Sequence, residues 1–422
     1  MKYLKVFLCC ILVGSLSACQ VVTNEEEIKE EETQEEVVVE EETKTETTTE
    51  EIYATANVTS DGIIDATDLF TDRDLLQTPD LSSAKTLELK DGEETTITEE
   101  GIYVVSGSYN NSTIVVEADS EAKVQIVLDG VDITNTSAPA IYVKSADKLF
   151  VTTTDSENTL KVTGTFVADD TTNLDGVIFS KDDVVVNGLG VLNISSTDNG
   201  IVSKDELKVT GSTLNIDCVN NALEAHDGIA VADGVFNIES DDDGLHAEDD
   251  EDDTVGYVYI CGGTFNINAA DDAIRGTTYL QIDDGKLTMS AVEALESTYV
   301  QINGGTLDIT SSDDGINAST KSTICTPQID INGGDITIVM GQGDTDAIDS
   351  NGYLYINGGT LNITAQSPFD YDLDAQYTGG TMIVNGQETT EITNQMMGGG
   401  MMPGGMGGDH GPGGDFGGPG HP

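Results

Sequence analysis

The chain has 422 residues, of which 77 are Asp or Glu and 17 are Lys or Arg, so its formal net charge is −60 at pH 7. Such a charge excludes nucleic acid and anionic lipid as direct partners unless cations lie between them. Trp is absent, which argues against a sugar-binding face built from Trp rings, whereas the acidity suits an exported protein that holds divalent metal ions.

Residues 1–19 predict an export signal. Two lysines precede an apolar stretch over residues 6–16, which is typical of a signal peptide and too short for a membrane-spanning helix. Residues 16–19 read Leu-Ser-Ala-Cys and match the bacterial lipobox, so we expect Cys19 to be lipidated after cleavage. The alternative is a plain secretory signal with an incidental Cys. We therefore expect an exported, monomeric protein that faces outside and touches the membrane through its lipid anchor only.

The next segments differ in composition. Residues 20–57 are rich in Glu and Thr and predict a disordered linker, either a stalk or an inert spacer. Residues 58–395 form the predicted folded domain, and residues 396–422 predict a disordered tail rich in Met and Gly. Within the domain, residues 58–107 are the least regular part. We expect them to contain a short helix near 68–76 and to cap the open end of a stack of coils.

The rest of the domain repeats itself about every 21 to 24 residues, and two longer gaps of 29 and 32 residues mark inserted loops. Each unit has an acidic or amide pair, a Gly or Ala anchor, an aliphatic residue, a strand, a Gly-Gly turn and a second strand. The anchors are Gly176, Gly200, Ala222, Gly244, Ala273, Ala294, Gly315 and Ala347. Apolar residues alternate on both sides of the Gly pair, as in 300–309 and 354–363, so each arm is a strand.

Three short strands in each unit predict one turn of a parallel β-helix. A meander of hairpins leaves the third segment unexplained. The predicted fold is therefore all-β, a single-stranded right-handed parallel β-helix with an N-terminal cap, a disordered N-terminal linker and a C-terminal tail.

Stacking at about 4.8 Å between coils converts each repeated residue into a column. The column that directly precedes the anchors, here called the first column, contains Asp175, Asn199, Asn221, Asp243, Asp272, Glu293, Asp314 and Asp346. Two carboxylates at that spacing repel each other by about 1 kcal/mol even in water. Ca²⁺, which binds several oxygen ligands in loose geometry, is the cofactor that this column predicts. A solvated acidic edge, screened by water and salt, is the alternative.

The second column lies two residues after the anchors. It contains Val202, Glu224, His246, Arg275, Glu296, Asn317 and Asp349. We expect this mixture of acid, imidazole, amide and guanidinium to form a ligand-binding face. Arg275 has three open roles: binding a sugar carboxylate, acting as the base of a lyase beside Ca²⁺, or pairing locally with Glu296 or Asp272.

The third column contains amides within Leu/Phe-Asn-Ile triplets. Its members are Asn193, Asn215, Asn237, Asn266, Asp308 and Asn362. Stacked amides can hydrogen-bond to one another along a β-helix, so a structural ladder is the first interpretation. A flat polar face for a glycan is the alternative.

Several motifs together resemble one protein family. They are Leu-Ser-Ser-Ala at 81–84, Thr-Ile-Thr-Glu-Glu-Gly-Ile-Tyr at 96–103, Val-Leu-Asp-Gly-Val at 127–131 and Ala-Pro-Ala-Ile-Tyr-Val at 138–143. With the Asp-Asp-Gly-Ile and Asn-Gly-Gly-Thr-Leu repeats and the Met/Gly-rich tail, the chain from about residue 58 onward is similar to bacterial carbohydrate-binding-domain proteins of clostridial relatives. The resemblance implies a right-handed parallel β-helix with bound Ca²⁺, similar in fold to pectate lyases, that binds cellulose or acidic plant polysaccharide at the cell surface.

The resemblance also implies particular metal ligands. Matched residue by residue, its Asp-Asp-Gly/Ala motif places Ca²⁺ ligands at Asp242, Asp243, Asp271, Asp272, Asp313 and Asp314. The first column adds Asp346 as a seventh candidate. The coils of Ala222 and Ala294 depart from the motif, which leaves Ca²⁺ there in doubt.

Polysaccharide binding through Ca²⁺ bridges is the function that we predict first, because cationic residues are scarce. A Ca²⁺-dependent pectate-type lyase is the first alternative, with Arg275 as the candidate base and Lys181 and Lys204 more remote. A structural adhesin without a glycan ligand is the second.

Overall fold

The computed structural model describes residues 51–59, 62–342 and 345–394. The predictions for Cys19, for most of the linker and for the tail from residue 396 fall outside these ranges. Within them the chain is almost entirely β-structure, with one α-helix, α1 (Asp72–Leu75), and one 3-10 turn, η1 (Leu81–Ser83). Neither of these described helical segments is long and apolar enough to cross a membrane.

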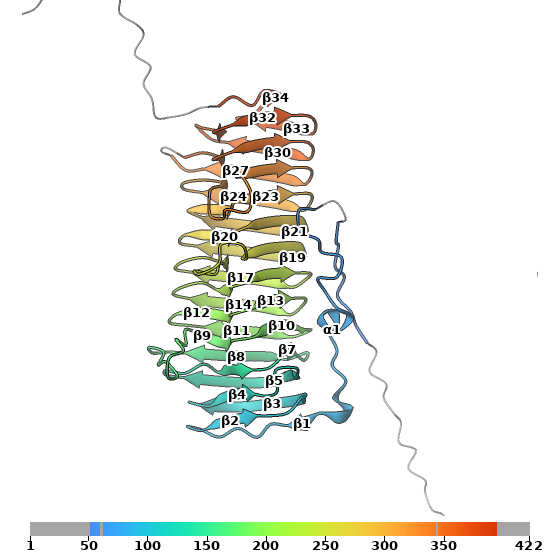
Figure 1. The fold of residues 1–422 in the computed structure, drawn as a ribbon, viewed down its shortest axis with the longest axis vertical. Helices are drawn as coiled ribbons and strands as arrows, with labels where there is room; N and C mark the ends of the chain where they lie inside the picture. The colour runs from blue at the N-terminus through green and yellow to red at the C-terminus, as the bar shows by residue number, and fades with distance from the viewer. Residues whose placement is uncertain (1–50, 60–61, 343–344, 395–422) are drawn as a thin grey trace, which may run out of the picture. The chain divides into compact units, whose positions relative to one another are not determined.

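The strands form two sheets, and both sheets extend along the stack of coils (Figure 1). We call the 12-stranded sheet the narrow sheet and the 22-stranded sheet the broad sheet. The narrow sheet contains β2 (Glu94–Ile97), β4 (Thr113–Glu117), β6 (Ile141–Ser145), β9 (Gly176–Ser180), β12 (Asn199–Ser203), β15 (Leu223–Ala225), β18 (Leu245–Ala247), β20 (Asp272–Gly276), β22 (Glu293–Ser297), β25 (Ile316–Ala318), β28 (Ile348–Ser350) and β31 (Asp370–Tyr371).

The broad sheet takes the two remaining arms of each coil. It contains β1 (Lys85–Thr86), β3 (Gly101–Asn110), β5 (Lys123–Asn135), β7 (Lys148–Thr153), β8 (Glu157–Val162), β10 (Asp183–Gly188), β11 (Val191–Ser195), β13 (Glu206–Val209), β14 (Thr213–Cys218), β16 (Gly228–Val231), β17 (Val235–Ser240), β19 (Tyr257–Ala269), β21 (Tyr279–Ala291), β23 (Tyr299–Ile302), β24 (Thr306–Ser311), β26 (Gln328–Ile331), β27 (Asp335–Met340), β29 (Tyr353–Ile356), β30 (Thr360–Thr364), β32 (Asp374–Tyr377), β33 (Thr381–Val384) and β34 (Gln387–Thr389).

Successive coils pair in parallel, as in β14 with β17 and β18 with β20. The final pair, β33 with β34, is antiparallel. One narrow-sheet strand and two broad-sheet arms recur in every regular coil, so the predicted all-β parallel coil is confirmed. Its right-handed sense stays a prediction.

The interior of the coil is filled by the apolar residues of the repeat. Leu214 and Ile216 are buried on one face of β14, and the rings of Phe236 and Phe265 stack one coil apart with centroids 4.2 Å from each other. At the corner between the broad-sheet arms, Gly305 has a φ of +88°, which a residue with a Cβ rarely adopts. The Gly-Gly turn of each repeat therefore permits the corner that keeps equivalent residues in register.

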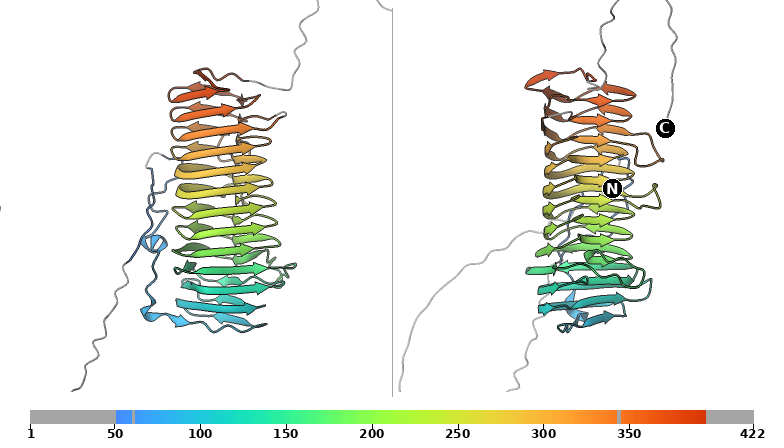
Figure 2. Two further views of the ribbon diagram at one scale, coloured as in Figure 1. Left: turned by 180° about the vertical axis from the view of Figure 1, so that it is seen from behind. Right: turned by 90° about the vertical axis from the view of Figure 1, so that its left-hand side faces the viewer.

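The described part of residues 51–84, which precedes β1, runs along the side of the broad sheet (Figure 2). The backbone N–H groups of Ile63 and Ile64 donate to Gln301 Oε1 at 3.0 Å and Gln281 Oε1 at 2.8 Å, and Gln77 Nε2 donates to the carbonyl of Thr210 at 3.0 Å. The rest of the predicted cap, through residue 107, forms β1, β2 and most of β3 at the first coil, so a cap at the open end stays a prediction, but the segment along the broad sheet does not form it. The irregular backbone of this segment satisfies its polar groups against side chains of the sheet, and the predicted short helix is α1.

Candidate functional site

The middle residue of a narrow-sheet strand points away from the core, and its exposure differs between coils: Val202 and Glu296 are buried, whereas Glu224 and His246 are partly exposed. In the three-residue strands β15 and β18 the first and third residues are buried in the core, while the middle residue is partly exposed. The backbone pairing places Val202, Glu224, His246, Arg275, Glu296, Asn317 and Asp349 opposite one another in successive coils. The predicted register of the second column is therefore confirmed.

The first column forms a ladder between side chains and backbone. Asn221 Oδ1 accepts the N–H of Asp243 at 3.2 Å, Asp243 Oδ1 accepts the N–H of Asp272 at 2.8 Å, and Asp314 Oδ1 accepts the N–H of Asp346 at 3.2 Å. Each of these side-chain oxygens thus satisfies the backbone of the next coil. The repeat predicts the column but gives no sign of this structural role.

Two groups of carboxylates lie close enough to share a cation. The first cluster contains Asp242, Asp243 and Asp271, and in it one ligand oxygen from each residue lies within 4.8 Å of the others. The second cluster contains Asp272, Glu293 and Glu296 under the same distance limit. Four of the predicted ligands therefore meet in two groups. The second cluster joins the first and second columns, a combination that the motif did not predict.

The carboxylates of the second cluster repel one another strongly. Asp272 is 3% exposed, and its burial, together with the nearby Asp243, Glu296 and Glu293 carboxylates, raises its pKa to about 9. Burial raises the pKa of Glu293 to about 7, although a hydrogen bond from Asn317 opposes the shift. At neutral pH this cluster must therefore retain a proton or bind a cation.

The donor set of the second cluster fits Ca²⁺. All three side chains offer oxygen, the ligand atom that Ca²⁺ prefers. Asn317 donates through Nδ2 to Glu293 Oε2 at 2.8 Å, and its buried Oδ1 has no hydrogen-bond partner among the described residues. Asp272, Glu293 and Glu296 could therefore hold the ion, whereas Asn317 turns its amide nitrogen toward these carboxylates. Lys321 Nζ lies 2.9 Å from Glu296 Oε2 and would share that carboxylate with the ion.

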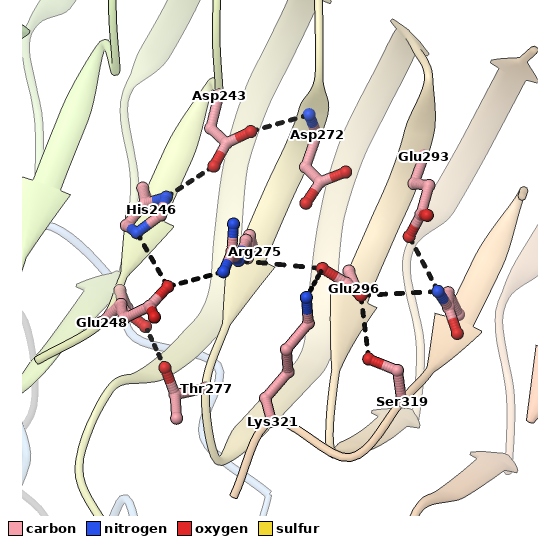
Figure 3. A network of polar contacts seen from close by, with 12 residues as sticks. Asp243, His246, Glu248, Asp272, Arg275, Thr277, Glu293, Glu296, Ser319 and Lys321 are labelled. Atoms are coloured by element: carbon pink, nitrogen blue, oxygen red, sulfur yellow. Dashed lines mark hydrogen bonds and ion pairs between the residues drawn. The ribbon is translucent and has the colours of Figure 1, made fainter. Parts of the chain in front are cut away.

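Arg275 and His246 connect the two clusters (Figure 3). Arg275 Nη2 donates to Glu248 Oε2 at 2.7 Å, and its Nε lies 3.7 Å from Glu296 Oε2. His246 Nδ1 lies 2.5 Å from Asp243 Oδ2, and its Nε2 lies 3.3 Å from Glu248 Oε2. Burial lowers the pKa of His246, but its bonds to Asp243 and Glu248 outweigh burial and raise the pKa to about 9. The imidazole is therefore charged at neutral pH.

The remaining candidates have different surroundings. Asp313 is exposed, and neither it, Asp314 nor Asp346 belongs to a three-ligand group among the described residues. Burial raises the pKa of Asp314 to about 8, and the Ser367 hydroxyl donates to Asp346. Asp349 faces Asp370 of the next coil; burial, reinforced by that carboxylate, raises the pKa of Asp349 to about 6.

Glu224, the other second-column candidate, pairs with Lys204. Its Oε1 lies 3.1 Å from Lys204 Nζ, and its Oε2 accepts a hydrogen bond from Asn199 Nδ2 at 2.8 Å. The carboxylate is thus already balanced by a cation, and it lies two coils away from Asp272, the nearest residue of the second cluster.

Amide ladders stabilise the broad sheet. Asn215 Nδ2 donates to Asn193 at 2.8 Å, and Asn237 and Asn266 continue the chain at 2.8 and 3.0 Å, which confirms the predicted ladder over these four residues. A second ladder was missed. It links Asn303, Asn332 and Asn357 at 2.8 and 2.9 Å, and the repeated Asn-Gly-Gly triplet is the signal that could have predicted it.

Comparisons with known proteins agree with the motif resemblance. The family model described as carbohydrate-binding domain-containing protein matches residues 91–345. A protein of that description from Acetivibrio thermocellus is 43% identical over 203 residues, which cover 47% of this chain and 70% of the relative. A solved polysaccharide lyase-like protein from C. thermocellum, studied as a gadolinium derivative, matches with 24% identity and a TM-score of 0.40 over 68% of this chain and 89% of that chain. Because the family model spans more than half of its length, the chain belongs to the family of carbohydrate-binding domain-containing proteins.

Proposed function

We propose that this chain binds an acidic polysaccharide through Ca²⁺ held on the narrow sheet. The observation that carries the proposal is the second cluster, in which Asp272, Glu293 and Glu296 converge at a largely buried position. A cation there relieves the repulsion that raises the pKa of Asp272 to about 9. An ion with free coordination positions can also bind a carboxylate of the glycan, which the net charge of −60 would otherwise repel.

The first cluster gives this face a second candidate ion position. Asp243 uses Oδ1 for the backbone of Asp272 and Oδ2 for His246, whereas Asp271 is exposed. An ion bound to Asp242, Asp243 and Asp271 would therefore lie nearer to solvent. Two such positions on adjacent coils suit a polymer whose charged groups repeat.

We further propose that the protein works at the outer surface of the cell as a monomer. The support is the export signal and the lipobox Cys of residues 16–19, with the linker as a spacer between the lipid and the folded domain. Acyl mass on Cys19 in the membrane fraction tests this part by itself.

The contacts of Arg275 fit a polysaccharide-binding protein better than a lyase. A lyase base must give up its proton to act, whereas Glu248 and Glu296 both contact this guanidinium. Burial lowers the pKa of Arg275, but Glu248 and the other nearby carboxylates raise it further than burial lowers it. We therefore assign Arg275 the role of a structural cation between the clusters.

The test is sedimentation of the protein with insoluble polygalacturonate in Ca²⁺ and in EDTA. We expect binding in Ca²⁺, loss of binding in EDTA, and weak binding by Glu293→Gln in both. Asp217→Asn is the matched control, because it removes one exposed charge from the broad sheet. Equal binding in Ca²⁺ and EDTA, or no binding in either, contradicts the proposal.

A further inference from the structure

A separate groove lies on the narrow sheet beside the carboxylate clusters. Its volume is about 760 Å³, within the usual range of roughly 300–1,000 Å³ for ligand pockets. Its lining includes Asp175, Lys181, Lys204, Glu224, His226 and His246. Asp272 and Glu293 do not line it, so this groove is a different place from the second cluster.

Two lysines and two histidines line this groove together with the carboxylates of Asp175, Glu224, Glu248 and Asp250. Burial lowers the pKa of His226, so its imidazole is mostly neutral at pH 7. Lys204 follows β12 and His226 follows β15, and their N–H groups donate to Ser180 at 2.9 Å and Ser203 at 3.1 Å of the preceding coils. Together with Lys181, which follows β9, they form a column at the end of three adjacent strands. Two of the 17 Lys and Arg residues and two of the four His residues thus line one groove.

The two lysines differ in their partners. Lys204 Nζ lies 3.1 Å from Glu224 Oε1 and 5.8 Å from the centre of the Phe179 ring, so it is held in place. Lys181 is exposed and makes no ion pair with any described residue, whereas Glu248, a carboxylate of the lining, is paired with His246 and Arg275. Lys181 is therefore the free cation of the groove.

The groove also contains an acceptor that lacks a donor. Asn173 Nδ2 donates to Asp175 Oδ2 at 2.9 Å, but Asp175 Oδ1 is buried and has no hydrogen-bond partner among the described residues. Burial raises the pKa of Asp175 to about 6, so it is still mostly a carboxylate at neutral pH. A buried acceptor without a donor is costly, and a ligand hydroxyl would satisfy it once the Asp175 side chain turns Oδ1 toward the groove.

We infer that this groove binds one uronate unit of an acidic glycan directly, without a bridging metal ion. The sugar carboxylate pairs with the ammonium groups of Lys181 and Lys204, and a ring hydroxyl donates to Asp175 Oδ1. A uronate carries both groups, whereas a neutral sugar lacks the carboxylate and inorganic phosphate lacks the ring. The inference rests on the proposed function and adds a binding subsite to it. The exposed Asp250 at the groove disfavours ligands with dense negative charge.

The experiment is isothermal titration of the Ca²⁺-loaded full chain with trigalacturonate, with cellotriose as the neutral probe. We expect Lys181→Ala and Asp175→Asn each to weaken trigalacturonate binding by about tenfold, the effect of losing one charge-assisted hydrogen bond. Lys286→Ala is the matched control, since Lys286 is also exposed and lies on β21 of the broad sheet. It should bind like the wild type.

Three outcomes overturn the inference: unchanged affinity of both groove variants, equal affinity for cellotriose, or full competition by inorganic phosphate. Both variants should remain folded, because Asp175→Asn is nearly isosteric and Lys181 is exposed. Unchanged melting temperatures verify that weaker binding does not come from unfolding. If polygalacturonate sediments the wild type in Ca²⁺ but the groove variants bind trigalacturonate normally, only the groove assignment fails. If the polymer does not bind at all, the proposed function fails first.

Discussion

Replacing Asp272 by Asn tests whether the second cluster is built around a cation. In the folded chain the pKa of Asp272 is raised from 3.8 to about 9 by burial and by the neighbouring carboxylates. Between these two values the unfolded chain has lost a proton that the folded chain retains, so stability falls by about 1.4 kcal/mol for each unit of rising pH. From 3.8 to pH 7 the loss is about 4 kcal/mol when no cation is bound.

The Asn side chain removes this loss and at the same time replaces a charged metal ligand by a neutral, weaker one. Without Ca²⁺, Asp272→Asn should therefore be more stable than the wild type at neutral pH, by up to about 4 kcal/mol, and its stability should vary less with pH. With Ca²⁺ the wild type should gain stability through binding, and the variant should gain little.

Urea unfolding in EDTA and in Ca²⁺ measures both effects when it is done at neutral pH and again near pH 3.8, the ordinary pKa of the Asp side chain. Asp217→Asn is the control, because Asp217 is exposed and lies on the broad sheet. The reasoning is refuted if Ca²⁺ leaves the wild-type midpoint unchanged while Asp272→Asn is the less stable protein at every pH.

Three further predictions concern the network and the corners. Arg275→Ala should destabilise the fold by about 2 kcal/mol, because it removes a charged hydrogen bond to Glu248; thermal unfolding measures this, and an unchanged melting temperature contradicts it. The pKa of His246 is raised from 6.5 to about 9, so the stability from its charge is complete below 6.5 and is lost as the pH rises toward 9. His246→Gln should flatten that decline in urea midpoints, and an identical pH profile would count against the network. Gly305→Ala places a Cβ 2.9 Å from a carbonyl oxygen of the previous coil at a φ of +88°, so the loss of stability should exceed the roughly 1–2 kcal/mol of the left-handed backbone alone. Gly92→Ala is the control that measures this backbone cost, because Gly92 has a φ of +76° and open space around it. Equal losses of stability in the two variants would exclude an effect of the close contact.

The sequence repeat was sufficient to predict the columns, because parallel pairing preserves the register of equivalent residues. The pairing of His246 with Arg275 and of Arg275 with Glu296 is what the anchor spacing requires. The course of the segment along the broad sheet could not be predicted in this way. It depends on single hydrogen bonds, such as that from Ile64 to Gln281, which leave no periodic pattern.

The same motif also leads to different surroundings in different coils. Asp242 and Asp271 lie in neighbouring coils and meet in the first cluster. Asp313 belongs to the same Asp-Asp motif, but its N–H donates to Val292 on one side, and the following coil carries Thr345 at the equivalent place. A motif match examines one coil, whereas a cation site depends on the coils on both sides. This is why Asp313 belongs to no three-ligand group within residues 51–59, 62–342 and 345–394.

Charge along the narrow sheet is balanced in three ways. In the coils of β12 and β15, Lys204 neutralises Glu224. In the middle coils, Arg275 and Lys321 only partly offset the carboxylates around Glu296. Further along, Asp314 and Asp349 have no Lys or Arg partner among the described residues, and burial raises their pKa values to about 8 and about 6. The need for protons or metal ions is therefore greatest in the middle coils, where the pKa of Asp272 is raised most and both carboxylate clusters lie. An acidic glycan lying along this face would meet lysines in the coils of β9 and β12 and depend on Ca²⁺ in the middle coils, so a glycan long enough to reach the carboxylate clusters should lose more affinity in EDTA than a short one.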